Sequence, residues 1–306
     1  MSNLSEERIF LNSIMEKLEF PEDARITLLT AFDKIADDKV ASAWFLYLLN
    51  LYKNKNVFDS QQIDSIKVLG NTLNIHEYTS AMILLLCMTE HLLKLYKERG
   101  LSEELWLNTI RDLKYKLLEC RSRHNIDGTS VVWWYPRFYK MELFMLGRLQ
   151  FEIFKLQSEF TVGGITLPIG TKTINMHIPK TGTPLNHDEV LESYKMAAQW
   201  FADEFQDQPM VFRCRSWLLF DWHKEVLPAN SNLIKFFNDF KIVENSTTDD
   251  YASLATVFGR ICEKYETDLP KDTTLRRAYA ERVERGDVVG HGHGLFIYKD
   301  GKIINN

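Results

Sequence analysis

The sequence changes its pattern near residue 125, and this change constrains the fold more than any single motif. Before it, long segments with helical apolar periodicity run almost without internal glycine or proline. After it, glycines, prolines and alternating segments such as "RLQFEIFKLQ" and "KTINMHI" indicate strands with helices between them. The two patterns predict an α+β protein, with an all-helical domain at residues 1–127 and a mixed α/β domain at residues 128–306.

The helical domain is expected to be a bundle around its two most apolar segments. "VASAWFLYLLNLYKN" (40–54) and "EYTSAMILLLCMTEHLLKLYKERG" (77–100) are both predicted at its centre, because they carry too few polar residues for a surface position. A helical domain as apolar as this one is also compatible with a homodimer. The longest apolar run, residues 81–88, is shorter than the roughly 20 residues that span a bilayer, so no membrane segment is expected.

Composition excludes several classes of function. The net charge of −5 over 306 residues gives no sign of a nucleic-acid-binding surface. The four cysteines are scattered without a C-x-x-C pair, which argues against structural zinc and against a disulfide framework. The start "MSNLSEERIF" has early acids and no signal-peptide apolar stretch, so a cytoplasmic location is expected.

The segment "INMHIPKTGTPLNHDEV" (174–190) joins a strand to a helix through a short polar loop. Asn186, with Glu189 three positions later, predicts a helix start near His187. Loop amides and the helix dipole at such a junction favour a phosphate, and Lys180 could add a direct contact. The acids of the first helical turn weaken that attraction, so an ordinary connection stays open as the alternative.

Several motifs in a fixed order resemble a known family. They are, in chain order, "LGRLQFE" (146–152), "MHIPKTGTPL" (176–185), "FRCRSWLL" (212–219), "LPANSNLIKF" (227–236) and "TTLRRAYAERVERGD" (273–287). The chain resembles acyltransferase-domain proteins that join a helical N-terminal domain to a C-terminal domain of the GNAT (N-acetyltransferase) superfamily. The resemblance implies transfer of an acyl group from acyl-CoA or acetyl-CoA to a primary amine on a small molecule or peptide.

By this resemblance, the loop after the strand holds the CoA pyrophosphate. The residues that it implies for cofactor binding are Ile178, Lys180, Thr181, Gly182, Thr183 and Leu185. The loop has one glycine where the superfamily usually has two small residues. The backbone N–H of Ile178 would be the oxyanion donor.

His177 is the candidate general base, since it lies at the strand end and its ordinary pKa is near neutral. A role in holding the loop is the alternative for this histidine. Cys214 could relay an acyl group if His177 lies beside it, and a buried structural thiol is the alternative. Ser216, Asp221 and His223 are the residue types of a hydrolase triad but lack the G-x-S-x-G elbow.

Other residues carry weaker signals. Arg213 and Arg215 could meet an acidic substrate or CoA phosphates, although solvated or ion-paired arginines are the usual case. In "GDVVGHGHGLFIY", His291 and His293 are too few for a metal site, and the alternating glycines favour a closely packed strand. No metal is expected. Aromatic residues Trp133, Trp134, Tyr135 and Trp217 are expected in the core or between domains, with ligand stacking as the alternative.

The sequence therefore favours an acyl-CoA N-acyltransferase. The rival interpretation is a non-catalytic ligand- or partner-binding protein on the same fold, in which the loop has lost CoA affinity. A hydrolase that forms an acyl-cysteine at Cys214 is a third possibility.

Overall fold

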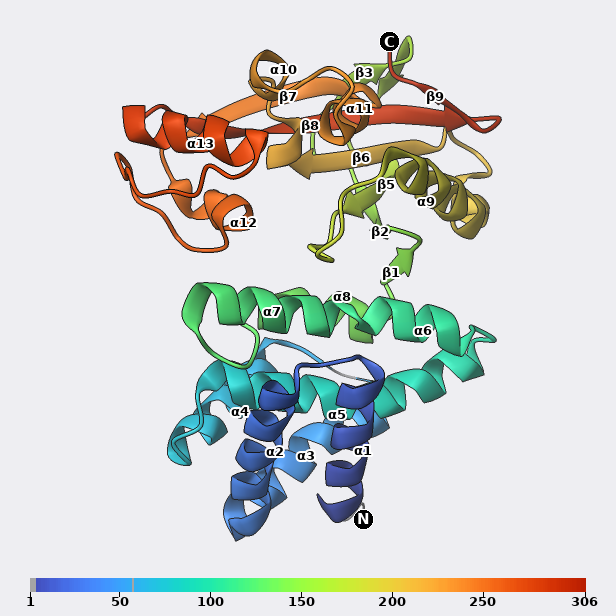
Figure 1. The fold of residues 1–306 in the computed structure, drawn as a ribbon. Coiled ribbons are helices and arrows are strands. Elements are labelled where there is room, and N and C mark those ends of the chain that lie inside the picture. Colours follow the sequence, from blue (N-terminus) through green and yellow to red (C-terminus); the bar gives the residue numbers. More distant parts are fainter. Residues whose placement is uncertain (1–3, 57) are drawn as a thin grey trace. The chain divides into compact units, whose positions relative to one another are not determined.

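The computed structural model describes residues 4–56 and 58–306. Contacts divide the chain into two compact units, residues 1–144 and 145–306. The first unit is helical and the second combines a sheet with helices, as the sequence predicts for an α+β protein (Figure 1). The boundary lies later than residue 127 because Tyr139 donates a hydrogen bond to Leu85 O and accepts one at its own carbonyl from Tyr52. These contacts hold the segment before residue 144 in the helical unit.

The helical unit is arranged around its longest helix, α5 (Glu77–Glu98). All eight residues from Ala81 to Met88 are buried, which confirms this segment as the centre of the bundle. The other helices of this unit are α1 (Leu4–Lys17), α2 (Glu22–Asp37), α3 (Lys39–Lys55), α4 (Ser60–Thr72), α6 (Glu103–Ile110), α7 (Asp112–His124), η1 (Val132–Trp134) and α8 (Pro136–Tyr139).

Helix α3 differs from the expectation of a central position. Its buried residues, such as Phe45 and Leu49, lie on one side, whereas Val40 is 75% exposed and Tyr47 is 61% exposed. The prediction was wrong because an apolar composition alone does not say that every side of a helix is covered. None of the helices among the described residues has the length and apolarity needed to cross a bilayer.

The second unit contains a seven-stranded sheet in the order β1-β2-β5-β6-β8-β7, with β9 on the end of β8. A separate hairpin is formed by β3 and β4. The strands are β1 (Leu143–Leu146), β2 (Leu149–Lys155), β3 (Phe160–Val162), β4 (Ile165–Leu167), β5 (Lys172–His177), β6 (Val211–Ser216), β7 (Lys241–Thr248), β8 (Val289–Lys299) and β9 (Lys302–Ile304). Both predicted turns are confirmed, at Gly163-Gly164 and at Asp300-Gly301, and all four residues have positive φ.

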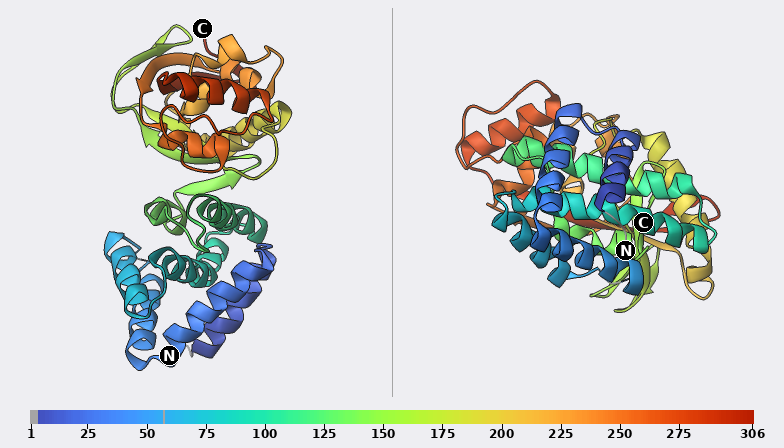
Figure 2. Two further views of the ribbon diagram at one scale, coloured as in Figure 1. Left: turned by 60° about the vertical axis from the view of Figure 1, so that its left-hand side comes forward. Right: turned by 90° about the horizontal axis from the view of Figure 1, so that it is seen from below.

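The helical elements of this unit connect the strands and cover the sheet. They are α9 (His187–Trp200), η2 (Ala202–Phe205), η3 (Trp217–Leu219), α10 (His223–Val226), α11 (Asn232–Asn238), η4 (Tyr251–Leu254), α12 (Ala255–Phe258) and α13 (Thr274–Arg285). Figures 1 and 2 show α9 alongside the sheet. Tyr194 of α9 packs against Phe212 and Phe296, with ring centroids 5.6 and 5.0 Å away, so α9 covers one apolar face of the sheet.

Candidate functional site

The central parallel strands β5 and β6 separate before they end. Their register joins only Ile174 to Phe212 and Asn175 to Arg213. Beyond Asn175 and Arg213 both strands continue for at least two more residues. Among the described residues, no further pair joins β5 to β6 there. Unpaired strand ends expose backbone donors and acceptors that another extended group can bind. This divergence is therefore the position in the sheet where a ligand can insert.

His177 lies at the divergence as the last residue of β5, 26% exposed through its side chain. Its Nε2 lies 2.7 Å from Glu152 Oε1, and the Asn175 side-chain amide donates to the same carboxylate oxygen at 3.1 Å. A neutral imidazole that donates from Nε2 keeps Nδ1 as its basic nitrogen. The carboxylate, together with the Asn175 amide nitrogen 3.0 Å from Nε2, orients the ring.

The same network extends across the sheet. Arg213 donates to Asn175 Oδ1 at 2.6 Å and to His293 Nε2 at 3.0 Å, and its guanidinium lies 4.2 Å from the Phe154 ring centroid. His293 Nδ1 lies 3.2 Å from a Glu244 oxygen. Burial lowers the pKa of Arg213, and burial followed by the neighbouring Arg213 charge lowers the pKa of His293. The histidine is therefore held neutral, and five strands contribute to one polar face.

Sequence reasoning missed Glu152, Asn175 and Glu244. The signal for the first two was present, because alternation in "LQFEIFK" and "KTINMH" places Glu152 and Asn175 on one side of their strands. Only the register shows that these two residues are direct partners. Glu244 lies on β7, a strand that the sequence pattern did not indicate.

The loop after β5 is fixed largely by its own hydrogen bonds. Arg148 donates to Pro179 O at 3.1 Å and to Thr183 O at 3.4 Å. Thr181 N donates to Pro179 O, and the hydroxyls of Thr181 and Thr183 lie 2.9 Å apart. Gly182 has φ +86, and a Cβ atom added there would meet nothing within 4 Å. The loop is therefore ordered, open on one side at Gly182, and uses part of its amide groups internally.

The helix after this loop begins as predicted. α9 starts at His187, and the Asn186 side chain accepts hydrogen bonds from the backbone N–H groups of Asp188 and Glu189 at 2.9 and 3.4 Å. His187 pairs with the buried Asp239, 3.0 Å away. The N-terminal amides of α9 are thus capped by the chain itself, which leaves fewer of them for a bound phosphate.

Cys214 lies on the opposite face of the sheet from His177. Arg213 pairs with Asn175, so its side chain lies on the polar face together with that of Asn175. Cys214 is the next residue along β6 and pairs with Gly294, so its side chain points to the opposite face. The thiol is fully buried, and burial raises its pKa to about 12. Among the described residues, no hydrogen bond joins Cys214 to a histidine, and its pKa is influenced by burial and by Arg213. The remaining cysteines, Cys87, Cys120 and Cys262, are also buried.

We expect Cys214→Ala to retain acyl transfer within about threefold of the wild type, because a thiol with so high a pKa supplies almost no thiolate near pH 8. Steady-state rates with a fixed acyl-CoA and amine measure this. The native protein should also react slowly with a thiol reagent and rapidly after unfolding. A variant that folds normally but loses activity 100-fold would contradict this expectation and restore the acyl-cysteine hypothesis.

The triad-type residues do not converge. His223 Nε2 lies 2.8 Å from the Tyr279 hydroxyl, and burial lowers the pKa of His223 to about 4. Asp221 interacts instead with the Asn245 side chain, and Ser216 Oγ accepts from the Leu218 amide. Among the described residues there is also no group of three or more histidine, cysteine or acidic side chains placed to hold a metal. Each residue therefore has a structural role where it lies.

The predicted aromatic positions divide into exposed and packed side chains. Trp133 is 66% exposed, and its ring contacts Trp134, which in turn lies 4.3 Å from the Arg137 guanidinium. Tyr135 is buried in the helical unit. Trp217 packs against Tyr279 in the second unit, with ring centroids 6.0 Å apart.

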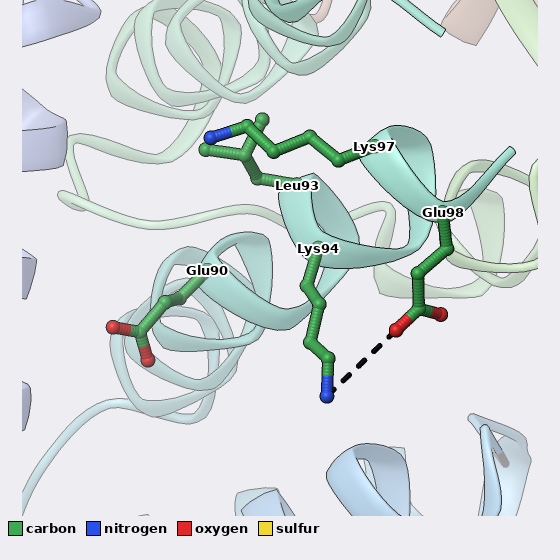
Figure 3. A pocket seen from close by; sticks show the side chains of 5 residues that line it. All are labelled: Glu90, Leu93, Lys94, Lys97 and Glu98. Carbon is green, nitrogen blue, oxygen red and sulfur yellow. Dashed lines mark ion pairs between the residues drawn. The ribbon is translucent and has the colours of Figure 1, made fainter. Parts of the chain in front are cut away.

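A hollow of about 560 Å³ lies on the helical unit. Its lining comes from one helix, α5, and the labelled side chains point in different directions (Figure 3). Lys94 and Glu98 pair with each other at 3.8 Å. Because these groups do not converge on a common point, this hollow carries no sign of catalytic chemistry.

Comparison with known proteins gives the family. Residues 9–141 match the N-acyltransferase N-terminal domain, and residues 143–296 match the GNAT-like C-terminal domain. A search of curated proteins finds no match. One similar solved structure is an acyltransferase in complex with decanoyl-CoA and teicoplanin, with a TM-score of 0.72 and 19% identity over 93% of this chain and 86% of that chain.

Two further structures have the same fold. One is an acyltransferase in complex with CoA and 10C-teicoplanin, with a TM-score of 0.72. The other is an acyltransferase mutant in complex with octanoyl-CoA, with a TM-score of 0.73. Each is 20% identical over 92% of this chain and 86% of that chain. The chain belongs to the family that joins an N-acyltransferase N-terminal domain to a GNAT-like C-terminal domain.

Proposed function

We propose that this protein transfers an acyl group from acyl-CoA to a primary amine of a small molecule. The observation that carries this proposal is the divergence of β5 and β6 with His177 at its edge, oriented by Glu152. The family descriptions and the acyl-CoA complexes of the similar structures agree with it. Two of these structures hold teicoplanin or an acylated form of it, which supports a small-molecule acceptor rather than a macromolecule.

In this proposal His177 Nδ1 takes the proton of the attacking amine, and Glu152 stabilises the resulting imidazolium. The amine nitrogen forms a bond to the thioester carbon, the carbon–sulfur bond breaks, and the thiolate leaves. The proton held by the imidazolium then passes to the thiolate, which gives free CoA and restores the neutral histidine. In this proposal the backbone N–H of Ile178, just beyond β5, donates to the carbonyl oxygen as negative charge develops. The side chains of the polar face hold the acceptor and exclude water.

The loop of residues 178–186 binds the pyrophosphate in this proposal. Lys180 supplies positive charge, and the open side at Gly182 lets a phosphate approach the backbone beside Thr181, Thr183 and Leu185. Because part of the loop's polar groups already bond to each other, some of these internal hydrogen bonds are replaced by contacts to the phosphates when CoA binds. The same bonds favour the second candidate function, a non-catalytic protein on this fold that binds a small ligand at the polar face.

A bulky residue at Gly182 should abolish acyl-CoA binding. We expect Gly182→Trp to weaken the binding of decanoyl-CoA at least 30-fold, because the indole occupies the open side where the phosphates approach. Isothermal titration of the full chain with acetyl-, octanoyl- and decanoyl-CoA measures this.

Gly170 provides a matched control. It has the same φ of +86 and likewise has nothing within 4 Å of an added Cβ atom, so Gly170→Trp imposes the same backbone strain away from the loop. An equal loss of acyl-CoA affinity in both variants would mean that backbone strain, and not a blocked phosphate site, weakens binding. A folded wild type that binds none of the three acyl-CoAs would overturn the transferase proposal and support the binding protein.

A further inference from the structure

A second cavity lies on the polar face next to the proposed reaction centre. It has a volume of about 360 Å³ and is lined by side chains from the ends of β6, β7 and β8, among them Arg215, Trp217, Thr248, Asp250 and His291. All of these residues belong to the second unit. This cavity is called the Arg215 pocket below.

The register places the Arg215 pocket beside His177. Asn175 and Arg213 are the last paired residues of β5 and β6, so His177 and Arg215 are each two residues further along parallel strands. Side chains two residues apart on a strand point to the same face. His177 and Arg215 therefore flank the divergence from its two sides on the polar face. A molecule whose amine reaches His177 extends naturally towards Arg215.

Arg215 carries a positive charge that no carboxylate of the described residues pairs with. Its Nη2 donates to His291 Nε2 at 2.9 Å. His291 Nε2 also lies 2.9 Å from Ser246 Oγ. Burial and the neighbouring Arg215 charge lower the pKa of His291, so the imidazole accepts the hydrogen bond as a neutral ring. The remaining guanidinium donors suit a planar carboxylate, which binds arginine through two hydrogen bonds.

The phosphates of CoA do not account for this charge. The loop of residues 178–186 leads into α9, and Tyr194 of α9 packs on the apolar face against Phe212. Arg215 belongs to the other face. Asp250 on the pocket wall further limits the negative charge that the pocket accepts, which favours a single carboxylate over a phosphate dianion.

We propose that the Arg215 pocket binds a carboxylate of the acceptor, so that the acceptor is an amino acid or a similar amine carrying one acidic group. This inference rests on the proposed function, because it names the acceptor class of that same site. Arg215 is a specificity residue in this proposal, and His177 remains the proton acceptor. Neutral amines of the same length are poorer acceptors because they leave the guanidinium without its partner.

The test compares matched acceptors with decanoyl-CoA as donor. β-Alanine should be acylated with kcat/KM at least tenfold higher than β-alaninamide or ethanolamine phosphate. Arg215→Gln should remove this preference by raising KM for β-alanine to about the value for β-alaninamide. Arg277→Gln, which alters an exposed arginine of α13 whose side chain donates to the Lys271 carbonyl, should behave as the wild type.

A binding measurement separates this inference from the proposed function. N-Decanoyl-β-alanine should bind the full chain at least tenfold more tightly than its amide, with the difference lost in Arg215→Gln. If no amine is acylated but this difference holds, the transferase proposal fails and the carboxylate pocket stands. Equal binding of acid and amide by the wild type, or a preference for ethanolamine phosphate in the transfer assay, would overturn the pocket assignment.

Discussion

Replacement of His177 by alanine is expected to lower kcat/KM for acyl transfer by 10²- to 10⁴-fold, the range for loss of a positioned general base. The loss should appear in kcat, because in the proposed mechanism His177 acts on the amine proton and not on CoA binding. Its side chain is one-quarter exposed and bonded to Glu152, so its removal leaves no large cavity. Single-turnover rates with decanoyl-CoA and a saturating amine measure the chemical step directly.

Glu152 and His177 should behave as one unit. Glu152→Gln is expected to slow transfer about tenfold in the wild type and to have no further effect in His177→Ala, because the carboxylate acts through the imidazole. His124→Ala, which removes an exposed histidine of α7, serves as the control. Additive losses in the double variant, or normal turnover by His177→Ala, would return His177 to its alternative role as a residue that holds the loop.

The class of fold and the order of elements were predictable because they depend on periodicity and on turn residues. Helix α9 began where the Asn186 cap placed it, and both hairpins turned at their glycines. β7 was not predicted. Its sequence "KIVENSTT" is mostly polar and exposed, which is compatible with its place at the edge of the described sheet, where β8 is its neighbour. Such a segment becomes a strand because it pairs with β8, and its own residue pattern does not indicate a strand.

The site was only partly predictable for the same reason. The sequence indicated His177 and the loop, which lie together along the chain. Glu152, which orients His177, is 25 residues away and is placed by strand register. The separation of β5 from β6 has no local signal either, because both strands read as continuous apolar alternation. The separation depends on how two distant segments pair with each other, and the pattern of each segment alone does not show this.

The repeated glycines of "GHGHG" are explained by packing on the apolar face. His291 and His293 point to the polar face, so Gly290, Gly292 and Gly294 face the elements that cover the other side. A Cβ at Gly292 would lie 2.0 Å from the Leu219 carbonyl oxygen, which is backbone and cannot rotate away. At Gly294 the closest atom is Phe240 Cβ, at 2.7 Å. The glycines therefore let η3 approach the sheet closely.

Gly292→Ala should consequently destabilise the second unit by about 3 kcal/mol, the upper range for overpacking a core. The backbone amides of β8 should then exchange with solvent roughly 100-fold faster, since every 1.4 kcal/mol corresponds to a factor of ten. Amides of α5 in the helical unit should be unaffected and serve as an internal reference. Gly164→Ala, at a turn with φ +71 and nothing within 4 Å, should cost only about 1 kcal/mol of backbone strain. Unchanged exchange of β8 in Gly292→Ala would show that η3 can move away from the sheet, and close packing would then not explain the glycine.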